Sequence, residues 1–125
     1  MNPTPVPYTI DEFRVLSLNT HKCYNVLIAL LNSTDPKNFD VLCIQEPPPD
    51  LNKYPSLSSP HWDRILPTFR TSSPDTLLYV NKSIPSSSYS QNTINSSFVT
   101  SISLTLESHL IHILIPPLSR PFPLL

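Results

Sequence analysis

Residues 15–19 (VLSLN) and residues 41–46 (VLCIQE) are the two stretches that decide the fold. Each is an apolar run that ends in a polar side chain, Asn19 in the first stretch and Glu46 in the second. Between them, residues 21–32 place apolar side chains at the i, i+3, i+4, i+7 spacing of one helix face, which predicts a strand-helix-strand unit. A right-handed crossover makes the two strands parallel neighbours, so both polar ends meet at one edge. Because ligands bind beyond the carboxyl ends of strands in open α/β sheets, this edge is the predicted place for a cation and a phosphate.

Further strand patterns follow this unit. The predicted strands are residues 13–18, 39–44, 62–66, 76–80, 98–106 and 110–115. The last two are separated by a short turn and predict a hairpin, in which residues 98–106 alternate between an apolar and a polar face. A Ser-rich loop is expected over residues 81–91. The predicted fold class is α/β.

Composition limits the domain organisation and the partners. The chain has 125 residues, a formal net charge of -1, 16 prolines and no glycine. These values predict a single domain or part of one, over residues 13–115, between a disordered segment (residues 1–12) and a Pro-rich tail (residues 116–125). Bulk charge does not attract a polyanion, and the absence of glycine excludes glycine-rich phosphate loops.

Cysteine usage and hydropathy bear on the compartment. Two cysteines, Cys23 and Cys43, without an apolar leader predict free thiols and an intracellular protein, nuclear or cytoplasmic and not secreted. The apolar stretch at residues 110–115 is far shorter than the roughly 20 residues that cross a bilayer, so no membrane association is expected.

Three short motifs occur in a characteristic order: residues 16–22 (LSLNTHK), 40–47 (DVLCIQEP) and 78–82 (LYVNK). Together they resemble the amino-terminal half of the endonuclease/exonuclease/phosphatase superfamily, most closely the endonuclease domains of fungal non-LTR retrotransposons. The resemblance implies that residues 13–115 form part of a four-layered α/β sandwich, one mixed sheet with a packed helix, whose second half is missing.

The resemblance also implies a reaction, divalent-metal-assisted cleavage of a phosphodiester, with DNA as the partner of intact relatives. It implies that Asn19 and Glu46 are catalytic residues, that Glu46 is a Mg²⁺ ligand, and that Lys22 binds phosphate. Mg²⁺ takes one or two carboxylates and completes its shell with water and substrate oxygens, which agrees with this set. The family has further Asp-x-Asn and Asp-His elements after the third motif, and no Asp occurs after residue 82 of this sequence. The prediction is therefore a truncated, inactive endonuclease domain derived from a retroelement, with weak or vestigial Mg²⁺ binding, and its status as an enzyme stays open.

Other interpretations remain open from the sequence. Asn19 is an ordinary turn former after a strand, and Glu46 could be a solvated charge at a strand end. The chain could also be a small interaction module that uses its half-sheet and Pro-rich tail, or a gene-model remnant without function. A half-sheet that lacks its second sheet exposes apolar surface, which predicts self-association.

Overall fold

The computed structural model describes residues 12–51, 59–68, 74–94 and 99–115. The predicted N-terminal segment lies outside these ranges apart from Glu12, and the predicted Pro-rich tail lies entirely outside them. The elements are β1 (Val15–Asn19), α1 (Tyr24–Ser33), β2 (Val41–Gln45), β3 (Trp62–Ile65), β4 (Thr76–Asn81), the 3₁₀ helix η3 (Ser86–Ser88), β5 (Tyr89–Gln91), β6 (Thr100–Leu106) and β7 (His109–Ile115).

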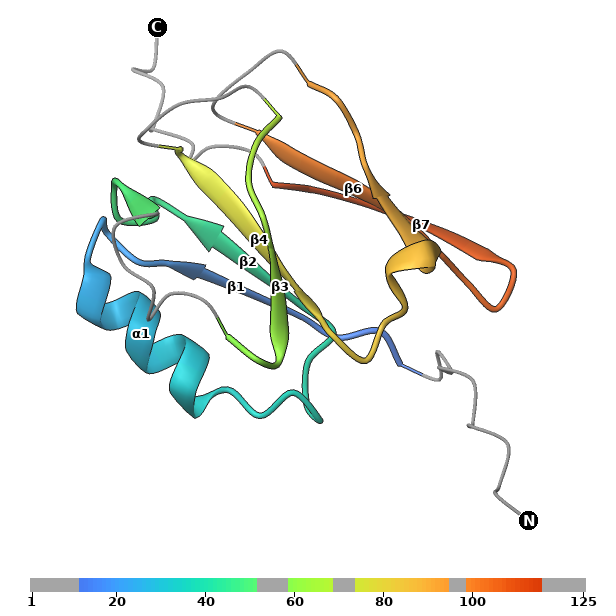
Figure 1. Cartoon of the computed structure of the whole chain (residues 1–125), viewed down its shortest axis with the longest axis horizontal. Coiled ribbons are helices and arrows are strands. Elements are labelled where there is room, and N and C mark those ends of the chain that lie inside the picture. Colours follow the sequence, from blue (N-terminus) through green and yellow to red (C-terminus); the bar gives the residue numbers. More distant parts are fainter. Residues whose placement is uncertain (1–11, 52–58, 69–73, 95–98, 116–125) are drawn as a thin grey trace, which may run out of the picture.

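The first sheet has four strands in the order β1-β2-β4-β3 (Figure 1). The strands β1 and β2 are parallel, with Asn19 beside Gln45, whereas β4 pairs antiparallel with both β2 and β3. The sheet is therefore mixed, and the predicted parallel neighbours are confirmed. Because α1 connects two parallel strands of one sheet, the carboxyl ends of β1 and β2 lie at the same edge.

Helix α1 covers one face of the first sheet (Figure 1). Its buried side chains, Leu27 and Leu31, are four residues apart and pack with Trp62, Leu77 and other residues in the first apolar cluster. The helix begins at Tyr24, three residues later than predicted, because residues 21–22 have φ angles of 51° and 57° and cannot be helical.

A second sheet covers the other face of the first one. It contains β5, β6 and β7 in that order, all antiparallel, and its inward side chains join a second apolar cluster with residues of β2 and β4. The predicted hairpin is thus β6 and β7, and part of the predicted Ser-rich loop at residues 81–91 instead forms η3 and β5. The α/β class is confirmed, as is the mixed sheet with its packed helix. No described helix is long and apolar enough to cross a membrane.

Strands β2 and β4 are the middle of the molecule. Every residue of β4 and the first four residues of β2 are buried. Successive side chains alternate between the two clusters, so that Leu42 and Ile44 join the first while Val41 and Cys43 join the second. Burial raises the pKa of the Cys43 thiol to about 11, so this cysteine behaves as a core residue.

The turn between β6 and β7 is strained by its residue types. Glu107 and Ser108 have φ angles of 49° and 68°, which is the left-handed region that two-residue hairpin turns use and that favours glycine. A β-carbon in this region costs about 1 kcal/mol.

We therefore expect Ser108→Gly to raise the free energy of unfolding by about 1 kcal/mol, measured by urea denaturation. Ser90→Gly is the matched control, because Ser90 lies in an extended strand, β5, where glycine only adds freedom to the unfolded chain. A loss of stability in both variants would contradict the strain assigned to this turn.

Candidate functional site

The predicted site residues meet at the carboxyl ends of β1 and β2. Asn19 is the last residue of β1 and lies opposite Gln45, and Glu46 follows Gln45 directly. The backbone N–H of Thr20 donates to the carbonyl of Gln45 at 3.0 Å, so the two chains stay together beyond the strands. The structure thus places Asn19 and Glu46 side by side at one edge, as the sequence pattern indicates; their chemical roles remain expectations.

Three hydrogen bonds hold the backbone of Glu46. Its N–H donates to the carbonyl of Asp75 at 3.0 Å. Its own carbonyl accepts from the Thr20 hydroxyl at 2.7 Å and from the Lys22 N–H at 2.7 Å. These bonds fix Glu46 at a φ of 49°, a left-handed conformation that an ordinary residue adopts only when its surroundings impose it. Such imposed strain is concentrated at functional sites in proteins.

Thr20 is the positioning residue that sequence reasoning missed. It is fully buried, and its hydroxyl spans from the loop after β1 to the loop after β2. The available signal was a hydroxyl residue directly after a strand-ending Asn, since short hydroxyl side chains bond readily to neighbouring backbone. That signal alone does not identify the carbonyl that the hydroxyl would find.

The carboxylate of Glu46 points to a polar, accessible environment. Its side chain is 34% exposed, and Oε2 lies 3.6 Å from Nδ1 of His21, whose side chain is 78% exposed. An exposed pair of this kind contributes little to stability and does not block the carboxylate. Glu46 can therefore present its oxygens to a cation from solvent.

Asn19 and Lys22 have different local roles. The Asn19 side-chain oxygen accepts from the His21 N–H at 2.7 Å, which makes a compact turn after β1. This bond is the ordinary turn function, and it leaves the second lone pair of the same oxygen available. Lys22 is exposed at the same edge and carries the positive charge nearest in sequence to Asn19.

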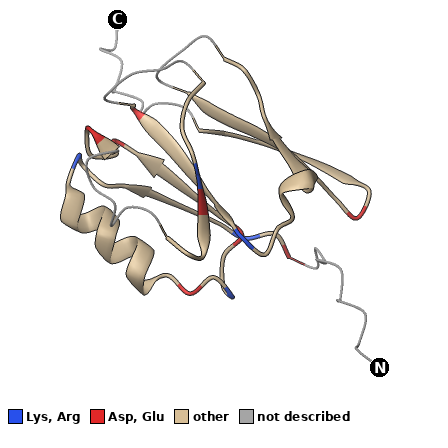
Figure 2. Cartoon of the chain, in the orientation of Figure 1, with Lys and Arg blue, Asp and Glu red and all other residues tan. Residues whose placement is uncertain are grey.

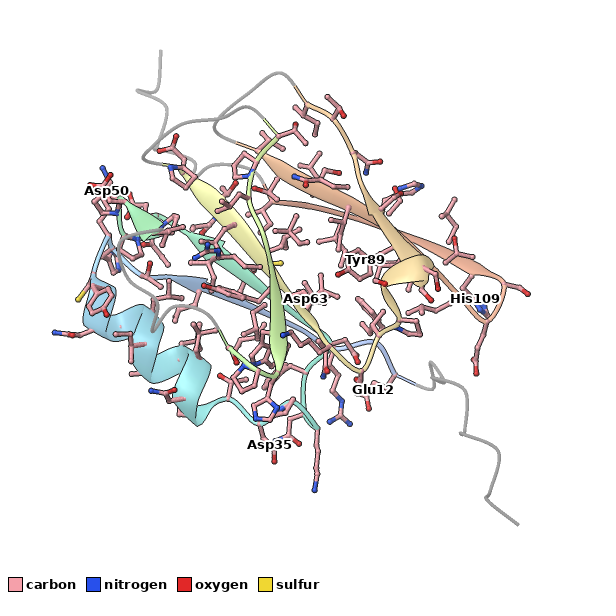
Figure 3. All side chains as sticks on the ribbon, in the orientation of Figure 1. Glu12, Asp35, Asp50, Asp63, Tyr89 and His109 are labelled. Carbon is pink, nitrogen blue, oxygen red and sulfur yellow. The ribbon has the colours of Figure 1, made fainter. Side chains whose placement is uncertain are left out.

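Left-handed residues gather at this edge. In a chain without glycine, six described residues have positive φ, and four of them are His21, Lys22, Glu46 and Asp50. Figure 3 places Asp50 at the same end of the molecule as the loop after β1, and Figure 2 shows both acidic and basic stretches there. The other two form the β6–β7 turn. The edge therefore concentrates both backbone strain and charge.

The donor set fits Mg²⁺ as one carboxylate with one amide oxygen. Mg²⁺ is commonly held by one or two carboxylates and keeps several waters, so it needs no complete protein cage. Within the described ranges, no group of three or more His, Cys, Asp or Glu side chains is arranged to hold a metal ion. At this edge Glu46 supplies a carboxylate and Asn19 an amide oxygen as donors.

A separate cleft of about 470 Å³ lies at the opposite end of the first sheet. It is lined by Pro36, Lys37, Asp40, Pro60, His61, Asn81, Lys82 and Ser83, and none of the predicted site residues is among them. Burial raises the pKa of Asp40, and the hydrogen bond from the Arg14 N–H at 2.7 Å opposes that rise.

Comparisons with known proteins address the fold. No family model and no curated protein matches the chain. A solved structure, the endonuclease domain of TRAS1, a telomere-specific non-LTR retrotransposon, is similar with a TM-score of 0.63 and 14% sequence identity. The match covers 89% of this chain and 48% of that one, so the chain spans about half the length of the domain that it matches. The protein therefore has an endonuclease-like fold over the 89% of its length that the match covers.

Proposed function

We propose that this chain is the metal-binding part of a retroelement-derived endonuclease domain of the endonuclease/exonuclease/phosphatase superfamily, and that it does not cleave DNA by itself. The observation that carries the proposal is the backbone of Glu46, which lies beside Asn19. It has a left-handed φ and is held by three hydrogen bonds. Backbone strain imposed by the surroundings is concentrated at functional sites, and a metal ligand must be held in a fixed orientation. The endonuclease-like fold adds support.

In this proposal Glu46 would bind Mg²⁺ through its carboxylate, and Asn19 would bind the ion or the scissile phosphate through its amide. Lys22 would pair with a phosphate oxygen. When bound, Mg²⁺ supplies Lewis-acid stabilisation of charge on the phosphate. The chain's own contribution is to aim the Glu46 carboxylate, which the Thr20 hydroxyl and the Lys22 N–H accomplish through the backbone.

Cleavage needs more than a metal ligand. A general acid or base contributes about 10² to 10⁴ in rate, and a preorganised charge stabiliser contributes about 10² to 10³. Among the described residues, His21 is the only imidazole near Glu46, and its 78% exposed side chain is not oriented by a buried carboxylate. We therefore propose an inactive domain with weak Mg²⁺ binding, in an intracellular setting where DNA is present.

Metal titration tests the proposal. We expect Mg²⁺ or Mn²⁺ to produce saturable shifts of the amide resonances around Glu46 in the full chain, and Glu46→Gln to abolish them because it removes the charge but keeps the shape. Glu107→Gln is the matched control, since Glu107 has the same φ of 49° and lies at the distant β6–β7 turn. Equal binding by the two variants would reject the metal role.

A plasmid-nicking assay with Mg²⁺ tests the second half of the proposal. We expect the full chain to remain at the background rate of a buffer control. Nicking that is clear in the unaltered chain and lost in Glu46→Gln would show an active nuclease and overturn the assignment of inactivity.

A further inference from the structure

Strand β7 is an unpaired edge of the second sheet. It pairs with β6 over seven positions, from Leu106 beside His109 to Thr100 beside Ile115. No described strand pairs with its other side, and Figure 1 shows it running beside β6. An open edge presents main-chain donors and acceptors to any strand that fits.

The main-chain groups on this free edge can be identified. The N–H of Asn92 donates to the carbonyl of Ser101 at 2.9 Å, so the main chain of Ser101 faces β5. Its partner Leu114 therefore points its N–H and C=O away from β6, because residues of an antiparallel pair that are not hydrogen-bonded to each other face outward. By alternation along the strand, His112 and Leu110 do the same. The free edge thus offers the donors and acceptors of Leu110, His112 and Leu114.

The side chains of the edge are unusually apolar. Leu110 and Leu114 are 63% and 56% exposed, more than Val15 at 44% and Val26 at 39%. Residues 109–115 contain no Lys, Arg, Asp, Glu or Pro. Natural edge strands carry such residues to prevent pairing with another chain, so β7 lacks the usual protection.

The sequence of β7 is symmetric about His112. Residues 110–114 read Leu-Ile-His-Ile-Leu in both directions. In an antiparallel pair of two identical strands centred on this residue, each leucine meets the other leucine and each isoleucine meets the other isoleucine. A pair centred on His112 also suits the main-chain groups of the free edge. The N–H and C=O of His112 face outward, so they can form both hydrogen bonds with the C=O and N–H of His112 in the second strand.

We propose that β7 pairs antiparallel with β7 of a second copy of this chain, around a two-fold axis at His112. The pairing joins the two three-stranded sheets into one continuous sheet and places Leu110 beside Leu114 of the other copy. No charged residue of β7 opposes it. A contact limited to one strand belongs to the small interfaces, below about 1,200 Å² in total, so we expect a dimer that dissociates on dilution.

Sedimentation of the full chain over a range of concentrations tests whether this dimer exists. We expect a monomer–dimer equilibrium that His112→Pro abolishes. The His112 N–H faces the free edge, so proline there removes no main-chain bond within the sheet. It does remove the hydrogen bond between His112 Nδ1 and the Ser103 hydroxyl at 2.8 Å, so an unchanged circular dichroism spectrum checks that the variant is folded. A monomer at every concentration would overturn the proposal, and so would a dimer that His112→Pro leaves intact in the folded state.

Disulfide trapping tests the register, in a Cys23→Ser background that leaves only the buried Cys43. Hydrogen-bonded antiparallel partners have Cα atoms about 5.5 Å apart, within the range of a disulfide. We expect His112→Cys to cross-link to itself. Leu110→Cys should not, because its counterpart would lie four residues, or about 14 Å, along the partner strand. A mixture of Leu110→Cys and Leu114→Cys should cross-link. Equal cross-linking of all three would indicate unspecific aggregation and reject the register, independently of any metal binding at Glu46.

Discussion

Asn81→Ala is expected to lower the free energy of unfolding by about 4 kcal/mol, on the basis of roughly 1 kcal/mol for each of the four lost hydrogen bonds. Asn81 is only 4% exposed. Its Nδ2 donates to the carbonyls of Pro36 and Phe39, at 2.6 and 3.1 Å, and its Oδ1 accepts from the N–H and hydroxyl of Ser83. One side chain therefore ties the loop after α1 to the end of β4. A domain of this size is stable by about 5 to 15 kcal/mol, so the loss is large.

Urea denaturation followed by circular dichroism measures this effect, and Asn38→Ala is its matched control. Asn38 is exposed in the same loop, and its main-chain bond to Asp35 does not depend on the side chain. We expect that control to change stability by less than about 0.5 kcal/mol. Asn81→Asp should be nearly as harmful as alanine, because its carboxylate would face two carbonyl oxygens. Similar effects of the Asn81 and Asn38 alanine variants would contradict the role given to the Asn81 side chain.

Thr20→Val is expected to weaken Mg²⁺ binding by 10- to 100-fold, the effect typical of removing a group that orients a metal ligand. Valine keeps the volume of the fully buried threonine but cannot donate to the Glu46 carbonyl. The Glu46 backbone then keeps fewer of the bonds that impose its left-handed conformation, and the carboxylate is aimed less well. Stability should also fall by about 1 kcal/mol or more, because the hydrogen bond is lost.

The same metal titration and urea denaturation measure both effects of Thr20→Val. Thr105→Val is the control, because Thr105 is exposed on β6. The substitution makes the same chemical change far from Glu46. If the Thr20 variant loses stability but binds Mg²⁺ as tightly as the unaltered chain, Glu46 does not depend on Thr20 for its orientation.

The sequence was sufficient for the part of the fold whose periodicity is strong. Residues 15–19 and 41–46 end as parallel neighbours because a helix with a clear apolar face lies between them, and this is also why Asn19 and Glu46 could be placed together. The start of α1 was predicted three residues early, since residues 21–22 adopt left-handed φ without the glycine that would mark a turn.

The second sheet could not be inferred to the same degree. Strand β5 has three residues, too few for a periodic signal, and lies in a Ser-rich segment that reads as a loop. It is stabilised from a distance, through Asn92, whose amide donates to the hydroxyls of Ser101 and Ser103. The position of Thr20 was missed for a similar reason, because its partner, the Glu46 carbonyl, is 26 residues away. Contacts between distant residues leave no local pattern.

Strands β2 and β4 contribute side chains to both apolar clusters. If α1 or the second sheet separated from the first sheet, half of the buried side chains on these two strands would therefore be exposed to water. Loss of β5, β6 and β7 would expose Val41, Cys43, Leu78 and Val80 to solvent. Loss of α1 would expose the alternate residues on the same two strands. The two layers are therefore bound into one all-or-none unit, so that damage to either side of the central strands weakens the whole molecule.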